Sequence, residues 1–185
     1  MPRKFFTLDN HHVGVGVVPQ HQTMGEAYDY DATDSVYNLS FDSLVNFEPN
    51  FHTVILDNSA VLTDFVSSAP IRNSGFIISA RVRALLADFA MPPHRFYDLP
   101  MTHRNASVHG YCWLHLPQPD VSIPPDTSRT DAESIISESA ISNCALFRLY
   151  RPSRFAYCYV RDDLRQSLDE IGATGVRFGT PRLFR

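Results

Sequence analysis

The most informative stretch of this sequence lies near its middle, where a strand candidate, a helix cap and an amphipathic helix follow one another. The run GFII is short and apolar, as expected of a buried strand, and Ser79 stands directly after it at the position of an N-cap. Pro92 and Pro93 stand where the helix cannot continue. In SARVRALLADFA, apolar side chains recur at i, i+3, i+4 and i+7, which places them on one helix face: Val82, Leu85, Leu86 and Phe89. The pattern predicts a helix over residues 79–90.

A second amphipathic helix is predicted near the end of the sequence. In RDDLRQSLDEIG, three apolar residues share a face at i, i+4 and i+7: Leu164, Leu168 and Ile171. Asp162 and Asp163 occupy the first turn, where negative charge suits the helix dipole. Gly172 then follows at the position where helices often end with a left-handed residue. The pattern predicts a helix over about residues 161–171.

Short β-rich runs fill much of the remaining chain without alternating regularly with helices. The runs ALFRLY and FAYCYV are typical of a hairpin, and their connection RPSR contains Pro152, a turn residue. Further strand candidates are GFII, VHGYCWLHL, GVRF and the segment from Val13 to Val18. Because strands and helices are mixed, we expect an α+β fold with a mixed, mainly antiparallel sheet and the two amphipathic helices.

Size and composition exclude several classes of protein. A chain of 185 residues with 44% hydrophobic residues buries enough surface to fold without disulfides or metals. The cysteines are odd in number and lack a CxxC spacing, as is typical of reduced thiols: Cys112, Cys144 and Cys158. No apolar run approaches the about 20 residues of a membrane-spanning helix, and the start MPRKFFTLDNHH lacks a secretory signal. A cytoplasmic protein with no membrane contact is therefore expected.

Charge is distributed unevenly along the chain. Residues 1–70 contain nine acidic residues against Arg3 and Lys4, whereas the remainder is slightly basic, although the whole chain has a net charge of only -4. No run of basic residues occurs, which argues against a direct nucleic-acid partner. We expect residues 1–50 to form an acidic N-terminal region packed on or extending a main domain of residues 51–185.

Tyrosines alternate with carboxylates within this acidic region. One interpretation is a solvated loop whose tyrosines fold back onto the domain; the other is a surface for a basic protein partner. The second interpretation predicts these partner-binding residues: Glu26, Tyr28, Asp29, Tyr30, Asp31, Asp34 and Tyr37.

Motifs for catalysis or for cofactors are absent from the sequence. It contains no GxGxxG, GxxxxGK[ST], GxSxG, HExxH or EF-hand pattern. Neither the pair His11 and His12 nor the series His103, His109 and His115 has a recognised metal spacing. Cys112 could pair with His109 or His115 as a nucleophile, but nothing in the sequence supplies a third, orienting group. The residues alone favour a binding protein with no catalytic residues, no metal and no cofactor.

An ordered set of short segments resembles the eleventh immunity-protein family of bacterial polymorphic toxin systems. In chain order these are LTDF (Leu62 to Phe65), GFIISARVRALL (Gly75 to Leu86), FYDLP, YCWLHL, DTS, ALFRL and a final helix that closes in GATGVRF. The resemblance spans roughly residues 60–180. Its most specific parts are Ile77-Ile78-Ser79 and the stretch from Thr174 to Phe178.

The resemblance implies a non-enzymatic antidote that binds and neutralises a cognate toxin or secreted effector encoded beside it. It supplies no catalytic residues, because the family motifs read as structural: Ser79 as a helix cap, Gly172 and Gly175 as turns, Phe147 and Phe178 as core. The first fifty residues and the Pro-rich segment 117–130 depart from the family pattern. An alternative function is an effector-specific chaperone or adaptor, and a third is a small enzyme that uses Cys112 or the histidines.

Overall fold

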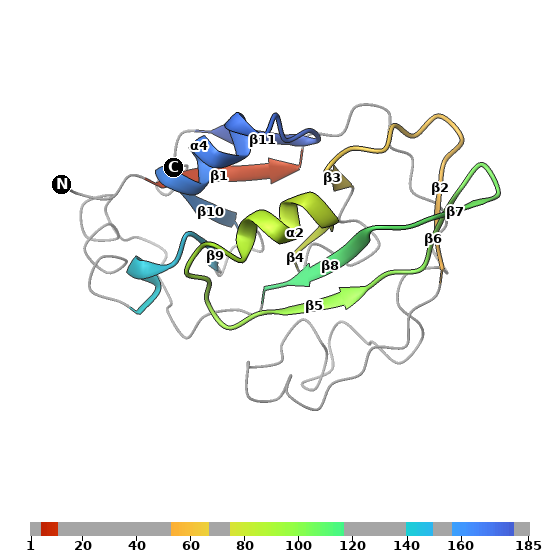
Figure 1. Cartoon of the computed structure of the whole chain (residues 1–185). Coiled ribbons are helices and arrows are strands. Elements are labelled where there is room, and N and C mark those ends of the chain that lie inside the picture. The colour runs from red at the N-terminus through yellow and green to blue at the C-terminus, as the bar shows by residue number, and fades with distance from the viewer. Residues whose placement is uncertain (1–4, 11–52, 67–74, 117–139, 150–156, 180–185) are drawn as a thin grey trace.

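The computed structural model describes residues 5–10, 53–66, 75–116, 140–149 and 157–179. Within these ranges the chain forms eleven strands in three sheets, two α-helices and the short 3₁₀ helix η2 (Ala140–Asn143) (Figure 1). Nine of the eleven described strands have only antiparallel partners, and the other two share one parallel pair, so the predicted α+β class with mainly antiparallel pairing is confirmed. The strands are divided among three sheets, however, rather than joined in one.

The first sheet joins the two ends of the described chain. Its order is β11 (Val176–Gly179), β1 (Phe5–Asn10), β10 (Tyr157–Arg161) and β9 (Leu146–Leu149), with every pair antiparallel. The predicted hairpin partners are β9 and β10, and the predicted GVRF strand is β11. β1 was not predicted from the sequence, and it pairs on both sides with C-terminal strands.

The second sheet contains the predicted GFII strand. Its order is β3 (Phe65–Val66), β4 (Gly75–Ser79), β8 (Tyr111–His115) and β5 (Arg95–Asp98), again all antiparallel. Successive side chains of a strand point to opposite faces, so Ile78 packs in one hydrophobic cluster and Ile77 in another. This sheet is therefore buried on both faces over its central strands.

The third sheet is small and consists of β2 (Val54–Leu56), β6 (Met101–His103) and β7 (Ala106–Val108). The pair β2 and β6 is parallel, whereas β6 and β7 form an antiparallel hairpin. Residues of β2 and β6 join Ile77, Tyr97 and Trp113 of the second sheet in the smaller hydrophobic cluster.

The two predicted helices are present as α2 (Ala80–Leu86) and α4 (Asp162–Glu170). The Oγ of Ser79 accepts a hydrogen bond from the amide of Val82, which confirms the predicted N-cap. Both helices contribute to the larger hydrophobic cluster together with the first and second sheets, with Val82, Leu86, Leu164 and Leu168 buried. None of the described helices has the length and apolar character needed to cross a membrane.

The helix predicted over residues 79–90 is too long at its C-terminal end. After Leu86 the amides of Asp88 and Phe89 bond to carbonyls three residues back, not four, so the α-helix tightens into a turn. The carbonyl of Ala90 then accepts a hydrogen bond of 2.7 Å from the amide of Ala145. This contact with a distant segment draws the chain off the helix axis before the prolines are reached.

Candidate functional site

The predicted partner-binding residues lie outside the described residues, so this prediction stays a prediction: Glu26, Tyr28, Asp29, Tyr30, Asp31, Asp34 and Tyr37. The same holds for His11, His12 and His21, and for the strand predicted from Val13 to Val18. The candidate site described below is therefore built from other residues.

The site lies where one long hairpin passes from the second sheet to the third. One arm runs through β5 and β6, and the other runs through β7 and β8. Asp98 pairs with Cys112 before the junction, and Met101 pairs with Val108 after it, which leaves two residues on the first arm opposite three on the second. This extra residue is the signature of a β-bulge, which kinks the hairpin. The run VHGYCWLHL, predicted as one strand, is consequently broken into β7 and β8.

The residues at the junction suit the kink. Pro100 has no amide to donate to a ladder, and Gly110 has a φ of +80°, a conformation that glycine adopts readily. The carbonyl of Gly110 accepts a hydrogen bond of 2.6 Å from the amide of Ala80, the first residue of α2. The kink is thus fastened to the start of the helix, where backbone amides lack intrahelical partners.

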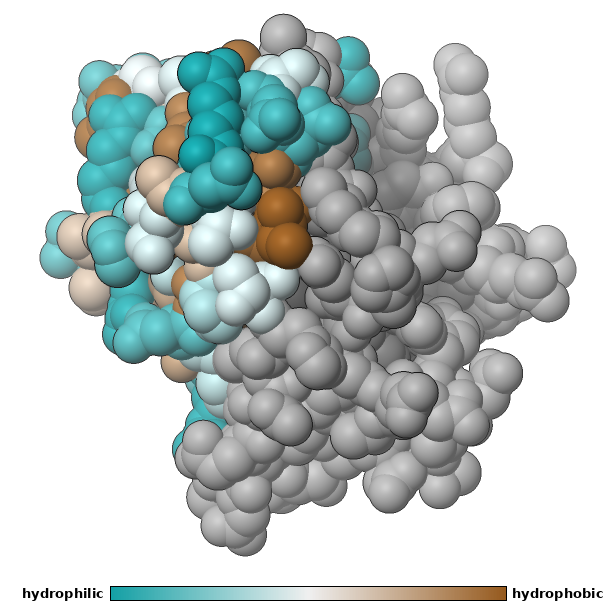
Figure 2. All heavy atoms as spheres, turned by 90° about the vertical axis from the view of Figure 1, so that its right-hand side faces the viewer, coloured by the Kyte–Doolittle hydropathy of each residue, from teal (hydrophilic) through white to brown (hydrophobic). Residues whose placement is uncertain are grey.

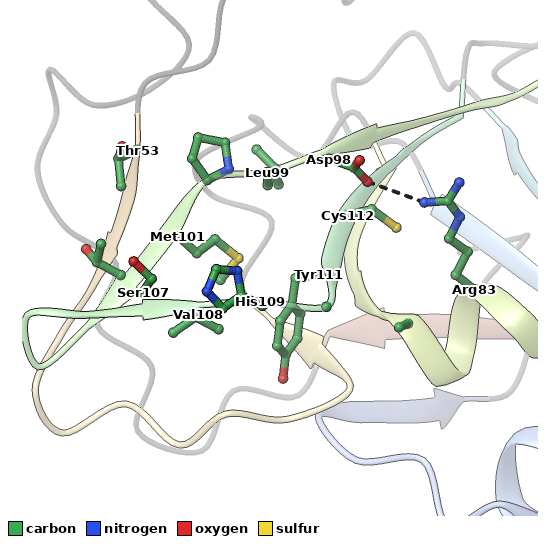
Figure 3. A pocket seen from close by; sticks show the side chains of 14 residues that line it. Thr53, Arg83, Asp98, Leu99, Met101, Ser107, Val108, His109, Tyr111 and Cys112 are labelled. Atoms are coloured by element: carbon green, nitrogen blue, oxygen red, sulfur yellow. Dashed lines mark hydrogen bonds and ion pairs between the residues drawn. The ribbon is translucent and has the colours of Figure 1, made fainter.

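A cleft of about 490 Å³ lies at this kink. Figure 3 shows Arg83 of α2 and Asp98 of β5 at one end and the β6 and β7 residues at the other. Leu99 and Met101 are almost fully buried and provide an apolar floor. Polar groups also line the cleft, namely those of Thr53, Thr102, Ser107, His109 and Tyr111. A cavity of this size with an apolar floor and a few polar groups is typical of a ligand-binding site.

An ion pair marks one end of the cleft. The distance between Arg83 Nη1 and Asp98 Oδ1 is 3.4 Å, and the side chain of Asp98 remains 93% exposed. The guanidinium of Arg83 also lies over the ring of Phe96, at 4.8 Å from its centroid. The arginine is therefore held on one side by an aromatic face, while the carboxylate projects into solvent.

The two histidines that were considered as partners of Cys112 lie in different places relative to this residue. His115 is buried and stacks on Trp113 with 4.6 Å between ring centroids, so it lies on the opposite face of β8 from Cys112. His109 does line the same cleft as Cys112. Burial raises the pKa of the Cys112 thiol to about 11, so the thiol is protonated at neutral pH and is a poor nucleophile. Among the described residues, no three His, Cys, Asp or Glu side chains are grouped so as to hold a metal ion.

A second constellation is centred on Asp64, which is buried. Its carboxylate pairs with Arg81 and accepts hydrogen bonds from Ser79 Oγ at 2.8 Å and from the amide and hydroxyl of Thr174 at 2.9 and 2.8 Å. Arg81 continues to the end of α4, where it donates to the carbonyls of Ile171 and Gly172. The Arg81 guanidinium is the main reason that the pKa of Asp64 lies far below its usual range.

This network contains residues from three of the seven segments that carry the resemblance. Asp64 belongs to LTDF, Ser79 and Arg81 to GFIISARVRALL, and Thr174 to GATGVRF. These segments are far apart in sequence but share one set of hydrogen bonds. Every acceptor on Asp64 is engaged within the protein, so the network stabilises the fold and offers no free group to a ligand.

Sequence reasoning missed the cleft residues Arg83, Asp98 and Met101. One signal was available: Pro100 and Gly110 both interrupt β-rich runs, and a hairpin brings two such breaks together. The depth of the cleft could not be read from the sequence, because it depends on how α2 docks against the kink.

Comparison with known proteins adds no family to this geometry. No protein-family model matches the chain, and no curated protein has significant sequence similarity to it.

Proposed function

We propose that this chain is an immunity protein that binds a cognate bacterial toxin or secreted effector and neutralises it without catalysis. The observation that carries the proposal is the Asp64 network, in which three of the seven segments of the resemblance meet. The proposal places the protein in the cytoplasm of the producing cell, beside newly made toxin.

The geometry of the cleft supports binding over catalysis. Its one thiol, Cys112, is 2% exposed and protonated, and its ionic groups, Arg83 and Asp98, neutralise one another. General acid–base catalysis typically uses an acid and a base whose environments shift their pKa values to opposite sides of neutral pH. An open cleft with an apolar floor and an ionic edge instead suits contact with a protein surface.

Co-expression with the toxic domain encoded beside this chain tests the proposal. We expect cells to survive and the two proteins to copurify, because inhibition by binding requires a stable complex. A toxin variant inactivated by mutation supplies the control for expression level.

The other outcomes point to the other functions. Copurification without survival would favour an effector-specific chaperone or adaptor, and would contradict the immunity function. Survival without a complex would favour enzymatic reversal of the damage, in which case the Cys112→Ser variant should lose protection.

A further inference from the structure

We infer that the cleft at the hairpin kink receives a lysine or arginine side chain of the bound protein, with Asp98 as its anionic partner. The inference rests on the proposed function only in naming the toxin as the source of that side chain. Three features of the cleft carry it: a carboxylate with unused acceptors, an arginine that is already engaged, and an apolar floor beside them.

The carboxylate of Asp98 has acceptors to spare. Its side chain is 93% exposed, and Arg83 is its one ionic partner among the described residues. Their separation of 3.4 Å exceeds the about 2.7–2.9 Å of a charge-assisted hydrogen bond. By contrast, Arg161 and Arg165 approach Asp163 and Asp169 to 2.7 and 2.8 Å elsewhere in this chain. Asp98 can therefore accept hydrogen bonds from a second cation at little cost to its present contact.

Arg83 is a weaker site for an incoming anion. One face of its guanidinium is covered by the ring of Phe96, and its charge is already compensated by its ion pair with Asp98.

The apolar floor distinguishes long cationic side chains from short acidic ones. Leu99 and Met101 are 6% and 2% exposed and line the cleft beside Val108. Lysine and arginine bury their methylene stems along such surfaces while the charged end reaches a polar partner, whereas aspartate and glutamate have stems of one or two methylenes. The apolar floor would thus contact the methylene stem of a lysine or arginine, and Asp98 would bind its charged end.

Tyr111 connects the cleft to an exposed apolar strip. Its hydroxyl donates a hydrogen bond of 2.9 Å to the carbonyl of Thr63, which fixes the ring at the cleft wall. Val61 and Leu62, directly before Thr63, are 55% and 41% exposed. The described surface at the end of the molecule that carries β2, β6 and β7 is mainly hydrophilic, with small hydrophobic areas (Figure 2). An ionic contact in the cleft beside an apolar contact at Val61 and Leu62 would give a partner both orientation and affinity.

The test uses a small probe, so that it does not depend on the toxin. The full chain is labelled with ¹⁵N and titrated with N-acetyl-arginine methylamide, while the amide signals of Leu99, Met101 and Tyr111 are followed. N-acetyl-norleucine methylamide and N-acetyl-glutamate methylamide serve as the neutral and acidic probes. We expect the arginine probe to shift these signals at the lowest concentration and the glutamate probe to be weakest.

Two variants identify the carboxylate responsible. Asp98→Asn should weaken binding of the arginine probe by about tenfold, which corresponds to the loss of one charge-assisted hydrogen bond. Asp88→Asn removes an exposed carboxylate near the end of α2 that does not line the cleft, and should leave binding unchanged. Because Asp98 is exposed, the substitution should leave the rest of the amide spectrum in place.

Equal or tighter binding of the glutamate probe would overturn the inference, as would unchanged arginine binding in Asp98→Asn or no binding at all. These outcomes are separate from the co-expression result. If the protein protects cells but its cleft does not bind the arginine probe, only this inference is contradicted. If the cleft binds the arginine probe selectively but the protein does not protect cells, only the proposed immunity function is contradicted.

Discussion

Asp64 joins three parts of the chain that are distant in sequence. It lies just before β3, accepts hydrogen bonds from Ser79 and Arg81 at the start of α2, and binds Thr174, which is 110 residues away. A buried carboxylate is costly unless its acceptors are satisfied, and here each oxygen has at least two donors. The sequence showed LTDF only as part of a resemblance, since nothing local indicates which donors an aspartate will meet.

Stability should depend on pH through Asp64. Its pKa is lowered in the folded state, chiefly by Arg81, so its contribution is complete above the unfolded pKa of about 3.9 and is lost as the pH falls through the folded value. At pH 6, Asp64→Asn should reduce the free energy of unfolding by about 2 kcal/mol, because hydrogen bonds to a charged group are lost. The difference from the unmutated protein should narrow below about pH 4.

Urea unfolding at pH 6 and pH 3 measures this dependence. Asp88→Asn is the matched control, since that carboxylate is exposed on the surface of the α2 region. A difference between Asp64→Asn and the unmutated protein that stays constant with pH would contradict the role assigned to the carboxylate.

Gly175 should be far less replaceable than Gly172, although both have positive φ. A Cβ at position 175 would lie 2.2 Å from the carbonyl oxygen of Phe65, whereas a Cβ at position 172 would meet nothing within 4 Å. Gly172→Ala should therefore cost about 1 kcal/mol for the left-handed backbone alone. Gly175→Ala adds a collision with backbone and should cost about 3 kcal/mol. The denaturant midpoints of the two variants measure these losses of stability. Equal losses would show that the close approach of the backbone at position 175 is easily relieved.

At the scale of elements, the two helices illustrate how far local signals extend. The apolar spacing located both, and the Ser79 cap and the left-handed Gly172, with a φ of +61°, stand where the sequence predicted them. The C-terminal end of α2 was wrong because a hydrogen bond between Ala90 and Ala145 overrides the helical pattern. β1 was missed because FFTLDN alternates poorly, and its partners β10 and β11 lie at the other end of the chain.

Ser79 should be more than a helix cap. It accepts from the amide of Val82 and donates to Asp64, so Ser79→Ala should lower the free energy of unfolding by about 2 kcal/mol, at the upper end for a cap residue. Aspartate normally caps a helix as well as serine does, but at position 79 it would face the carboxylate of Asp64. Ser79→Asp should thus be more destabilising than Ser79→Thr.

Thermal unfolding of the three Ser79 variants tests this expectation. Ser107→Ala, at an exposed position of β7, is the matched control and should leave the melting temperature unchanged. If Ser79→Asp were as stable as the unmutated protein, Ser79 would act as a cap alone.

At the scale of the whole molecule, charge is the property that bears most directly on a partner. The net negative charge is concentrated in residues 1–70, where nine acidic residues stand against two basic ones, and the predicted partner-binding residues lie in this region. If this charge steers association, replacing Asp29, Asp31 and Asp34 by lysine should slow binding of the cognate toxic domain by about tenfold or more at low salt. The dependence of the association rate on ionic strength should also flatten.

Stopped-flow or surface-based kinetics at two salt concentrations would measure this effect. Far-UV circular dichroism should show an unchanged fold, and Asp88→Lys provides a control for a single exposed charge reversal outside the acidic segment. Unchanged association in the triple variant would exclude the acidic segment as the steering surface.

Local signals in the sequence were sufficient to predict the α+β class, both helices, the strand β4 and the pairing of β9 with β10. Each of these depends on hydrophobic periodicity, caps or turns within about fifteen residues, and such local preferences act before any distant contact forms. Three features became visible only in the folded structure. They are the pairing of β1 with β10 and β11, the hydrogen bonds that distant segments make to Asp64, and the cleft between Asp98 and Met101. Those features depend on which distant segments come into contact when the core forms. Asp64 and Thr174 are 110 residues apart, and the sequence around either residue does not indicate that it will contact the other.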